Sequence, residues 1–202
     1  MSLPRGPRLL LALALAAALG ACGGADGPDL RPPLEAVADE EYAVLSAALM
    51  EHASRDGAQV LVVERATVAC VDYTCESYAQ AVGPFGAPPA DAFEDFLARN
   101  AASATLAERF APHMGLPVVL LGRDELAQLG GHGDFFGHLA EAYPGSHGVL
   151  MLGRVGFNRS MDLALVSIGN QYAGLGGYGL LQLYRKIDGV WVLQASRPTW
   201  IS

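Results

Sequence analysis

The sequence predicts an α+β fold, in which N-terminal helices pack on a mainly antiparallel sheet that ends in a four-strand meander. Segments with helical periodicity alternate with short apolar runs up to about residue 143, whereas strand patterns and turns fill the chain from Ser146 onward. Asp188-Gly189 separates the last two strand patterns, which is a strong hairpin signal. Four consecutive strands with short connections favour an antiparallel meander, with the earlier helices on one face.

The first part of the chain contains the predicted helices. Tyr42, Leu45 and Leu49 recur at helical spacing, and Asp39 stands where an N-cap is expected. The β-branched run at 60–63 predicts a buried strand. In chain order, we expect helix 40–52, strand 59–67, helix 91–100, a short helical turn at 104–110, strand 117–121, helix 124–129 and helix 135–143.

The last part of the chain contains the predicted meander. Its strands are expected at 148–157, 162–171, 178–187 and 190–201, with turns at 158–160 and 174–177. Gly174, Gly176 and Gly179 match the dinucleotide-binding pattern G-x-G-x-x-G. A strand rather than a helix follows them, and no acidic residue stands at the ribose spacing. The glycines therefore predict a strand connection, and no cofactor is predicted.

The N-terminus has the features of an export signal. Arg5 and Arg8 precede an apolar run of 11 residues at 9–19, and two small residues precede Cys22. The run is too short for an ordinary membrane-spanning helix, which needs about 20 residues. Residues 19–22, Leu-Gly-Ala-Cys, resemble the bacterial lipobox. The resemblance implies that residues 1–21 are a signal peptide and that Cys22 carries the lipid; the alternative is a plain secretory signal.

The expected cleavage makes the mature chain strongly acidic. The full chain has 13 basic and 21 acidic residues, and removal of residues 1–21 takes away two arginines and no acid, which leaves a net charge of about −10. An acidic body does not favour nucleic-acid binding. It is also repelled by anionic head groups, so the membrane is predicted as a partner only through the lipid at Cys22.

Cysteine usage agrees with an exported protein. Once Cys22 is committed to lipid, Cys70 and Cys75 remain, and an even pair in an exported chain is most simply a disulfide. A reactive or metal-binding dithiol is the competing interpretation. Residues 22–36 are small, polar and proline-rich, which is typical of a flexible tether, and 37–202 is long enough for a single α+β domain.

Several short segments resemble a group of small exported bacterial proteins of uncharacterised function. They cover mainly the C-terminal third and are 143–148 (Tyr-Pro-Gly-Ser-His-Gly), 153–158 (Gly-Arg-Val-Gly-Phe-Asn), 164–166 (Ala-Leu-Val), 189–192 (Gly-Val-Trp-Val) and 200–202 (Trp-Ile-Ser). Members of the group often carry a serine where Gly153 stands, and cysteines around the loop of Leu175 and Gly176. A disulfide between those cysteines cannot form in this chain. The resemblance supports the fold and implies no activity.

Two histidine motifs carry candidate chemistry. His132, Asp134 and His138 are residue types that bind metals, but Asp134 also stands where it can cap the helix from Phe135. No metal is predicted, and the role of this cluster stays open. Ser146 and His147 are neighbours, whereas a serine nucleophile needs its base across a hydrogen bond, and neighbours in an extended segment point to opposite faces.

Five other residues form a candidate binding surface: Arg154, Asn158, Asn170, Tyr172 and Trp200. An arginine inside an apolar strand needs a partner, and the structural interpretation is a salt bridge from Arg154 to an acid such as Glu141 or Asp162, with Trp200 in the core. The functional interpretation is a surface that recognises an anionic or aromatic ligand.

The leading functional hypothesis is a non-enzymatic, lipid-anchored domain of the cell envelope that binds an unknown envelope protein or a small ligand. The alternative is an envelope hydrolase whose active site one sequence does not reveal. A deep pocket with convergent titratable groups would favour the enzyme. Gly23 follows the expected lipidated cysteine, whereas aspartate there retains lipoproteins at the inner membrane. This difference favours the periplasmic face of the outer membrane.

Overall fold

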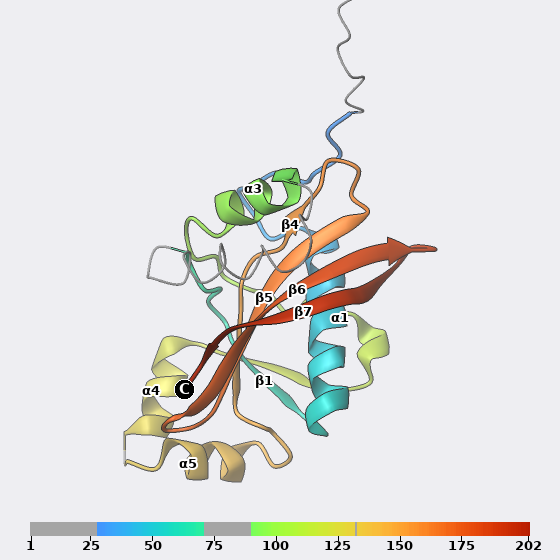
Figure 1. Ribbon diagram of the computed structural model, residues 1–202. Coiled ribbons are helices and arrows are strands. Elements are labelled where there is room, and N and C mark those ends of the chain that lie inside the picture. The colour runs from blue at the N-terminus through green and yellow to red at the C-terminus, as the bar shows by residue number, and fades with distance from the viewer. Residues whose placement is uncertain (1–27, 71–89, 132) are drawn as a thin grey trace, which may run out of the picture.

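The computed structural model describes residues 28–70, 90–131 and 133–202 of the chain (Figure 1). Over these residues the fold is α+β, as predicted, with four α-helices and a seven-stranded, mostly antiparallel sheet. The elements are α1 Asp39–Asp56, β1 Leu61–Glu64, α3 Ala90–Arg99, the 3₁₀ turn η2 Pro112–Met114, β2 Val118–Leu121, α4 Arg123–Gly130, α5 Phe135–Ala142, β3 Val149–Leu152, β4 Gly156–Phe157, β5 Leu163–Ala173, β6 Gly176–Ile187 and β7 Val190–Ile201.

The strands lie in the order β2-β1-β3-β5-β6-β7, and β4 pairs with β5 beside this path. β1 is parallel to β2 and to β3, whereas β3, β5, β6 and β7 are antiparallel neighbours. The predicted meander is therefore confirmed, but its first strand is split into β3 and β4. The split lies at Arg154, because its backbone N–H donates to Asn100 Oδ1 at 2.7 Å instead of to a strand.

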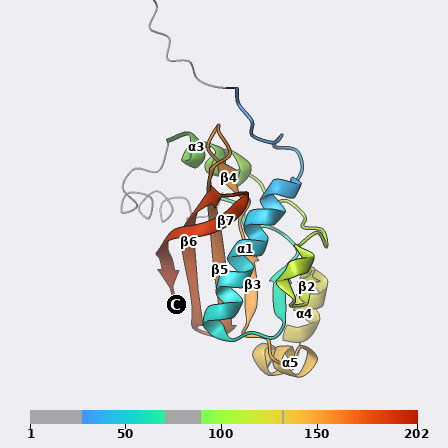
Figure 2. The ribbon, with the colours of Figure 1, turned by 90° about the vertical axis from the view of Figure 1, so that its right-hand side faces the viewer.

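Helices cover both faces of the sheet, which corrects the expectation that they lie on one face (Figure 2). Leu61 and Val63 of β1 belong to the core cluster under α1. Val62, which points to the opposite side, packs with Leu139 of α5 and residues of α4. Leu165 of β5 packs on α3, on the same side as α4 and α5. Side chains that alternate along the strands are thus buried on both faces of the sheet.

Two local predictions from the first part of the chain are wrong. Residues 104–110 form no helical turn, because their backbone pairs with the extension of β1: Thr67 N–H donates to the Ala104 carbonyl and Leu106 N–H to the Arg65 carbonyl, both at 2.8 Å. Asp39 is not the N-cap of α1. Ala38 occupies that position, and the Glu41 carboxylate accepts the Ala38 N–H at 3.2 Å.

The predicted connections at 174–177 and 188–189 are confirmed, although the first consists of residues 174 and 175 alone. Asp188 and Gly189 connect β6 to β7 with φ angles of 50° and 82°, and positive values at both positions are typical of a two-residue type I′ turn. Gly174 and Leu175 connect β5 to β6. The glycine-rich segment is therefore a strand connection, as predicted, and leads into a strand rather than a nucleotide-binding helix.

Candidate functional site

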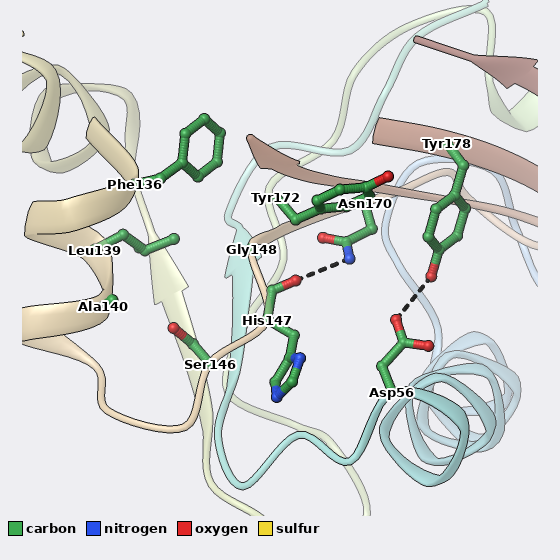
Figure 3. A pocket seen from close by; sticks show the side chains of 10 residues that line it. All are labelled: Asp56, Phe136, Leu139, Ala140, Ser146, His147, Gly148, Asn170, Tyr172 and Tyr178. Carbon is green, nitrogen blue, oxygen red and sulfur yellow. Dashed lines mark hydrogen bonds between the residues drawn. The ribbon is translucent and has the colours of Figure 1, made fainter. Parts of the chain in front are cut away.

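A pocket of about 490 Å³ lies at the end of the sheet, between the C-terminus of α1, the helix α5 and the ends of β5 and β6 (Figure 3). We call it the terminal pocket. Its described lining residues are Asp56, Phe136, Leu139, Ala140, Ser146, His147, Gly148, Asn170, Tyr172 and Tyr178. The volume is within the usual range for small-molecule sites, which is about 300–1,000 Å³.

Two buried polar atoms in the wall of the terminal pocket have no hydrogen-bond partner among the described residues. Asn170 is 1% exposed, and its Nδ2 donates to the His147 carbonyl at 2.9 Å, but its Oδ1 accepts no hydrogen bond. Ser146 Oγ is also unpartnered. An unsatisfied buried polar atom costs about 1–3 kcal/mol, so each one in a native protein calls for an explanation. A third such atom among the described residues, Thr199 Oγ1, is not part of the pocket lining.

Gly148 allows the loop before β3 to lie close to Asn170. Its φ is +103°, a value that L-residues rarely adopt. A Cβ at this position would stand 2.6 Å from Asn170 Oδ1 and 2.4 Å from the carbonyl oxygen of Gln171. Any side chain at position 148 would therefore push the loop away from β5 and change the wall of the terminal pocket.

The last turn of α1 forms a polar cluster against Tyr178, at the side of the terminal pocket. The Tyr178 hydroxyl donates to Asp56 Oδ2 at 3.1 Å, lies 3.0 Å from His52 Nδ1 and accepts a hydrogen bond from Arg55. Burial raises the pKa of Tyr178 to about 12, although the charge of Arg55 opposes this shift. Burial lowers the pKa of His52 to about 4, although Asp56 opposes it. Both groups are therefore uncharged near pH 7.

Asp56 supplies the negative charge of the lining. Burial alone would raise its pKa, but the hydrogen bond from Arg55 and the nearby charges outweigh burial, so the pKa lies below its usual value. Asp56 accepts from Arg55 Nε at 2.9 Å. The carboxylate is thus ionised at neutral pH.

Ser146 and His147 both line the terminal pocket but do not form a nucleophile and base. Their side chains point in different directions (Figure 3). Ser146 Oγ has no hydrogen-bond partner, whereas a serine nucleophile needs a base within hydrogen-bond reach. The pair therefore offers no hydrolytic chemistry in this arrangement.

The structure brings together only two residues of the predicted binding surface, Asn170 and Tyr172. Trp200 lies on the other face of the sheet, across Gly169 and Gly179, whose positions alternate with those of Asn170 and Tyr178. A Cβ on Gly179 would stand 2.0 Å from Trp200 Nε1. These glycines therefore make room for the indole ring.

Asn158 shapes the turn between β4 and β5. Its Oδ1 accepts the backbone N–H groups of Asp162 and Leu163 at 3.1 and 2.9 Å, and its Nδ2 donates to Asp162 Oδ1 at 2.6 Å. The side chain is therefore committed to local structure, away from the terminal pocket.

Arg154 belongs to a buried charged cluster, which we call the arginine clamp and which consists of Glu41, Asp95, Arg99 and Arg154. The side chain of Arg154 pairs with Glu41 at 2.6 Å, and Arg99 pairs with Glu41 at 3.2 Å and with Asp95 at 2.7 Å. The expected partners Glu141 and Asp162 are therefore wrong. Asp162 instead lies 3.6 Å from Arg185, across the β5–β6 pair.

The arginine clamp holds residues 32–36, which lie within the predicted tether. Arg99 donates to the carbonyls of Pro32 at 2.6 Å and Pro33 at 3.3 Å. Arg154 donates to the carbonyls of Leu34 at 2.5 Å and Ala36 at 2.8 Å. The described part of the predicted tether, from residue 28 on, therefore lies against the domain.

Several predicted positions fall outside the described residues. These are the signal peptide, Cys22, Cys75 and His132. The Cys70–Cys75 disulfide and the lipid at Cys22 thus stay predictions. Asp134 caps α5 by accepting the Gly137 N–H at 3.0 Å, as predicted, and His138 Nδ1 lies 2.9 Å from the Leu129 carbonyl.

The described residues show neither a metal-binding cluster nor a membrane-spanning helix. Within residues 28–70, 90–131 and 133–202, no three His, Cys, Asp or Glu side chains are grouped so that they could hold a metal ion. Over the same ranges, every helix is too short or too polar to cross a bilayer.

Comparison with known proteins assigns no relative to the chain. No family model matches it, and neither a curated protein nor a solved structure shows significant similarity to it.

Proposed function

We propose that the protein is a lipid-anchored component of the cell envelope whose α+β domain binds a small ligand in the terminal pocket. The observation that carries the proposal is the unpartnered Oδ1 of Asn170, a side chain that is 1% exposed and stands in the pocket wall. A ligand that donates a hydrogen bond there would remove the cost of the unsatisfied oxygen on binding.

The pKa shifts favour binding over acid–base catalysis. General acids and bases work best with a pKa near the operating pH. Burial lowers the pKa of His52 to about 4 and raises the pKa of Tyr178 to about 12, so neither group is suited to exchange protons near pH 7. The alternative of an envelope hydrolase thus gains no support from this part of the pocket, although titratable groups converge on it.

The positions of the arginine clamp and the terminal pocket fit a tethered receptor. Residues 28–36 meet the domain at the end that carries α3, and the pocket lies at the opposite end beside α5 (Figure 1). Leu30 N–H donates to the Arg159 carbonyl, so Leu30 is the eighth residue after Cys22. Eight residues span at most about 29 Å. A lipid at Cys22 would hold the α3 end near the bilayer, with the pocket facing away.

The anchor is tested by expressing the full chain in a bacterial host and comparing it with Cys22→Ala. We expect the wild type to lack residues 1–21, to gain an acyl mass and to follow the membrane fraction, and the variant to lose all three properties. Intact-mass spectrometry and fractionation provide the readouts. Two soluble, unacylated proteins would refute the anchor.

Ligand binding is tested by ligand-observed NMR with a library of small polar molecules and the purified full-length protein. We expect binders whose signals weaken with Asn170→Leu but not with Gln171→Leu. Gln171 is the matched control, because it is exposed, lies next to Asn170 on β5 and points to the opposite face. A library without any binder sensitive to Asn170→Leu would refute the proposed binding function.

A further inference from the structure

Three polar side chains of the terminal pocket can accept hydrogen bonds. Asn170 Oδ1 can only accept, Ser146 Oγ is unpartnered, and Asp56 is an ionised carboxylate. Among the described lining residues there is neither lysine nor arginine. Arg55, which is not a lining residue, pairs with Asp56 at 2.9 Å and offsets part of its charge. An anionic ligand would still find neither lysine nor arginine in the described lining, whereas a hydrogen-bond donor would find the unpartnered oxygens of Asn170 and Ser146.

The aromatic side chains of the pocket add a second preference. Tyr172 is 51% exposed, and its ring centroid lies 6.5 Å from that of Tyr178. The guanidinium carbon of Arg55 already lies 5.1 Å from the Tyr178 centroid, within the range of a cation–π contact. One ring of this pair thus has a cation against it, and the exposed ring of Tyr172 remains available to a ligand.

From these contacts we infer that the terminal pocket binds a small organic cation, namely a protonated amine attached to an apolar group. The ammonium group donates to Asn170 Oδ1 and faces Asp56, while the apolar group packs between Tyr172 and Phe136. The net charge of the chain, −8 before any cleavage, attracts cations over longer distances. This inference rests on the proposed function, because it names the ligand class of the same pocket.

Three probes of similar shape distinguish the effect of ligand charge on affinity from the effect of ligand shape. They are 2-phenylethylammonium, 2-phenylethanol and phenylacetate. Each is titrated into the ¹⁵N-labelled full-length protein, and dissociation constants are taken from the amide shifts of Gly148 and Asn170. We expect the ammonium probe to bind about tenfold more tightly than the alcohol, which is what one charge-assisted hydrogen bond or cation–π contact supplies. The carboxylate probe should bind most weakly.

Two variants identify the side chains that produce the affinity for the probes and the preference for ammonium. Asp56→Asn keeps the size of the side chain and removes its charge, so it should reduce the preference for ammonium over alcohol to about twofold. Asn170→Leu should weaken the ammonium and alcohol probes alike, by about tenfold, because both donate to Oδ1. Gln171→Leu should leave all three constants unchanged. The amide spectrum of each variant shows whether it is folded.

The outcomes separate the ligand class from the binding function. Equal affinities for ammonium and alcohol, or tightest binding of phenylacetate, would overturn the cation inference and leave the pocket as a binding site. No shift with any probe, combined with library binders sensitive to Asn170→Leu, would also overturn only the ligand class. If the library gives no such binder either, both proposals fail.

Discussion

Replacing Glu41 by glutamine should destabilise the protein strongly, because Glu41 is the shared acceptor of two buried arginines. Its side chain is fully buried and accepts from Arg99 and Arg154 and from the backbone N–H of Val155 at 3.2 Å. Glutamine keeps the volume but removes the charge. Only Asp95 would then remain in the arginine clamp to balance two guanidinium groups.

The expected cost follows from the burial of these charges. Removing one partner of a buried ion pair typically costs about 3–5 kcal/mol, since it leaves an uncompensated charge in the interior. This is a large fraction of the free energy of unfolding of an ordinary domain, about 5–15 kcal/mol. For a domain of this size, each kcal/mol lowers Tm by roughly 2–4 °C, so a decrease of roughly 6–20 °C is expected.

The assay is urea unfolding followed by the fluorescence of Trp191 and Trp200, the two tryptophans of the chain. Asp39→Asn is the matched control, because Asp39 lies in the same first turn of α1 and pairs with Arg109 at the surface, where it is 84% exposed. An exposed pair contributes about 0–1 kcal/mol. A cost for Glu41→Gln below about 1.5 kcal/mol, or equal to that of the control, would refute the reasoning.

Three further predictions concern pH, close packing and the arginine clamp. Because the folded-state pKa of His52 is depressed from 6.5 to about 4, its contribution is complete above pH 6.5 and is lost as the pH falls towards 4. The advantage of the wild type over His52→Gln in urea unfolding should thus shrink by about 2–3 kcal/mol between pH 7.5 and 4.5, and a constant difference would argue against a buried neutral imidazole. Gly156→Ala should cost more than about 2 kcal/mol, because its Cβ would stand 2.3 Å from Phe96 N, whereas Gly174→Ala, with open space around it, should change stability by less than about 0.5 kcal/mol. Combining Glu41→Leu with Arg154→Met should cost less than the sum of the single substitutions, because the pair is removed together; additive costs would mean that the two side chains do not interact.

Features with a local physical cause were predictable from the sequence. The Asp188-Gly189 hairpin forms because both positions adopt positive φ angles, and the Asp134 cap forms because its carboxylate reaches the free N–H of Gly137. The extended backbone at 104–110 was not predictable from the sequence. It forms because Thr67 and Leu106 take part in backbone hydrogen bonds across a long loop, and this pairing overrides local helix propensity. Such a partner is not visible in a window of neighbouring residues.

The terminal pocket was only partly predictable for the same reason. The sequence marks Asn170 and Tyr172 as polar residues before a glycine-rich turn, but it carries no distinguishing signal for His52 and Asp56. They contact Tyr178 across more than 120 positions of sequence. Arg154 shows the complementary case: its need for a buried acid followed from its apolar strand, whereas the identity of Glu41 depended on the tertiary fold.

The two buried polar regions of this domain differ in how completely they are satisfied, and this difference separates support from binding. In the arginine clamp, each guanidinium is paired with a carboxylate and with carbonyls of residues 32–36, so the cost of burying the charges is offset within the protein. In the terminal pocket, Asn170 Oδ1 and Ser146 Oγ lack this compensation. A domain that satisfies its buried charges at one end yet leaves a buried amide oxygen and a buried hydroxyl open at the other has a site where an added hydrogen-bond donor gains free energy. If the matched probes reveal no such donor preference, the open acceptors must instead be a cost that the remaining fold outweighs.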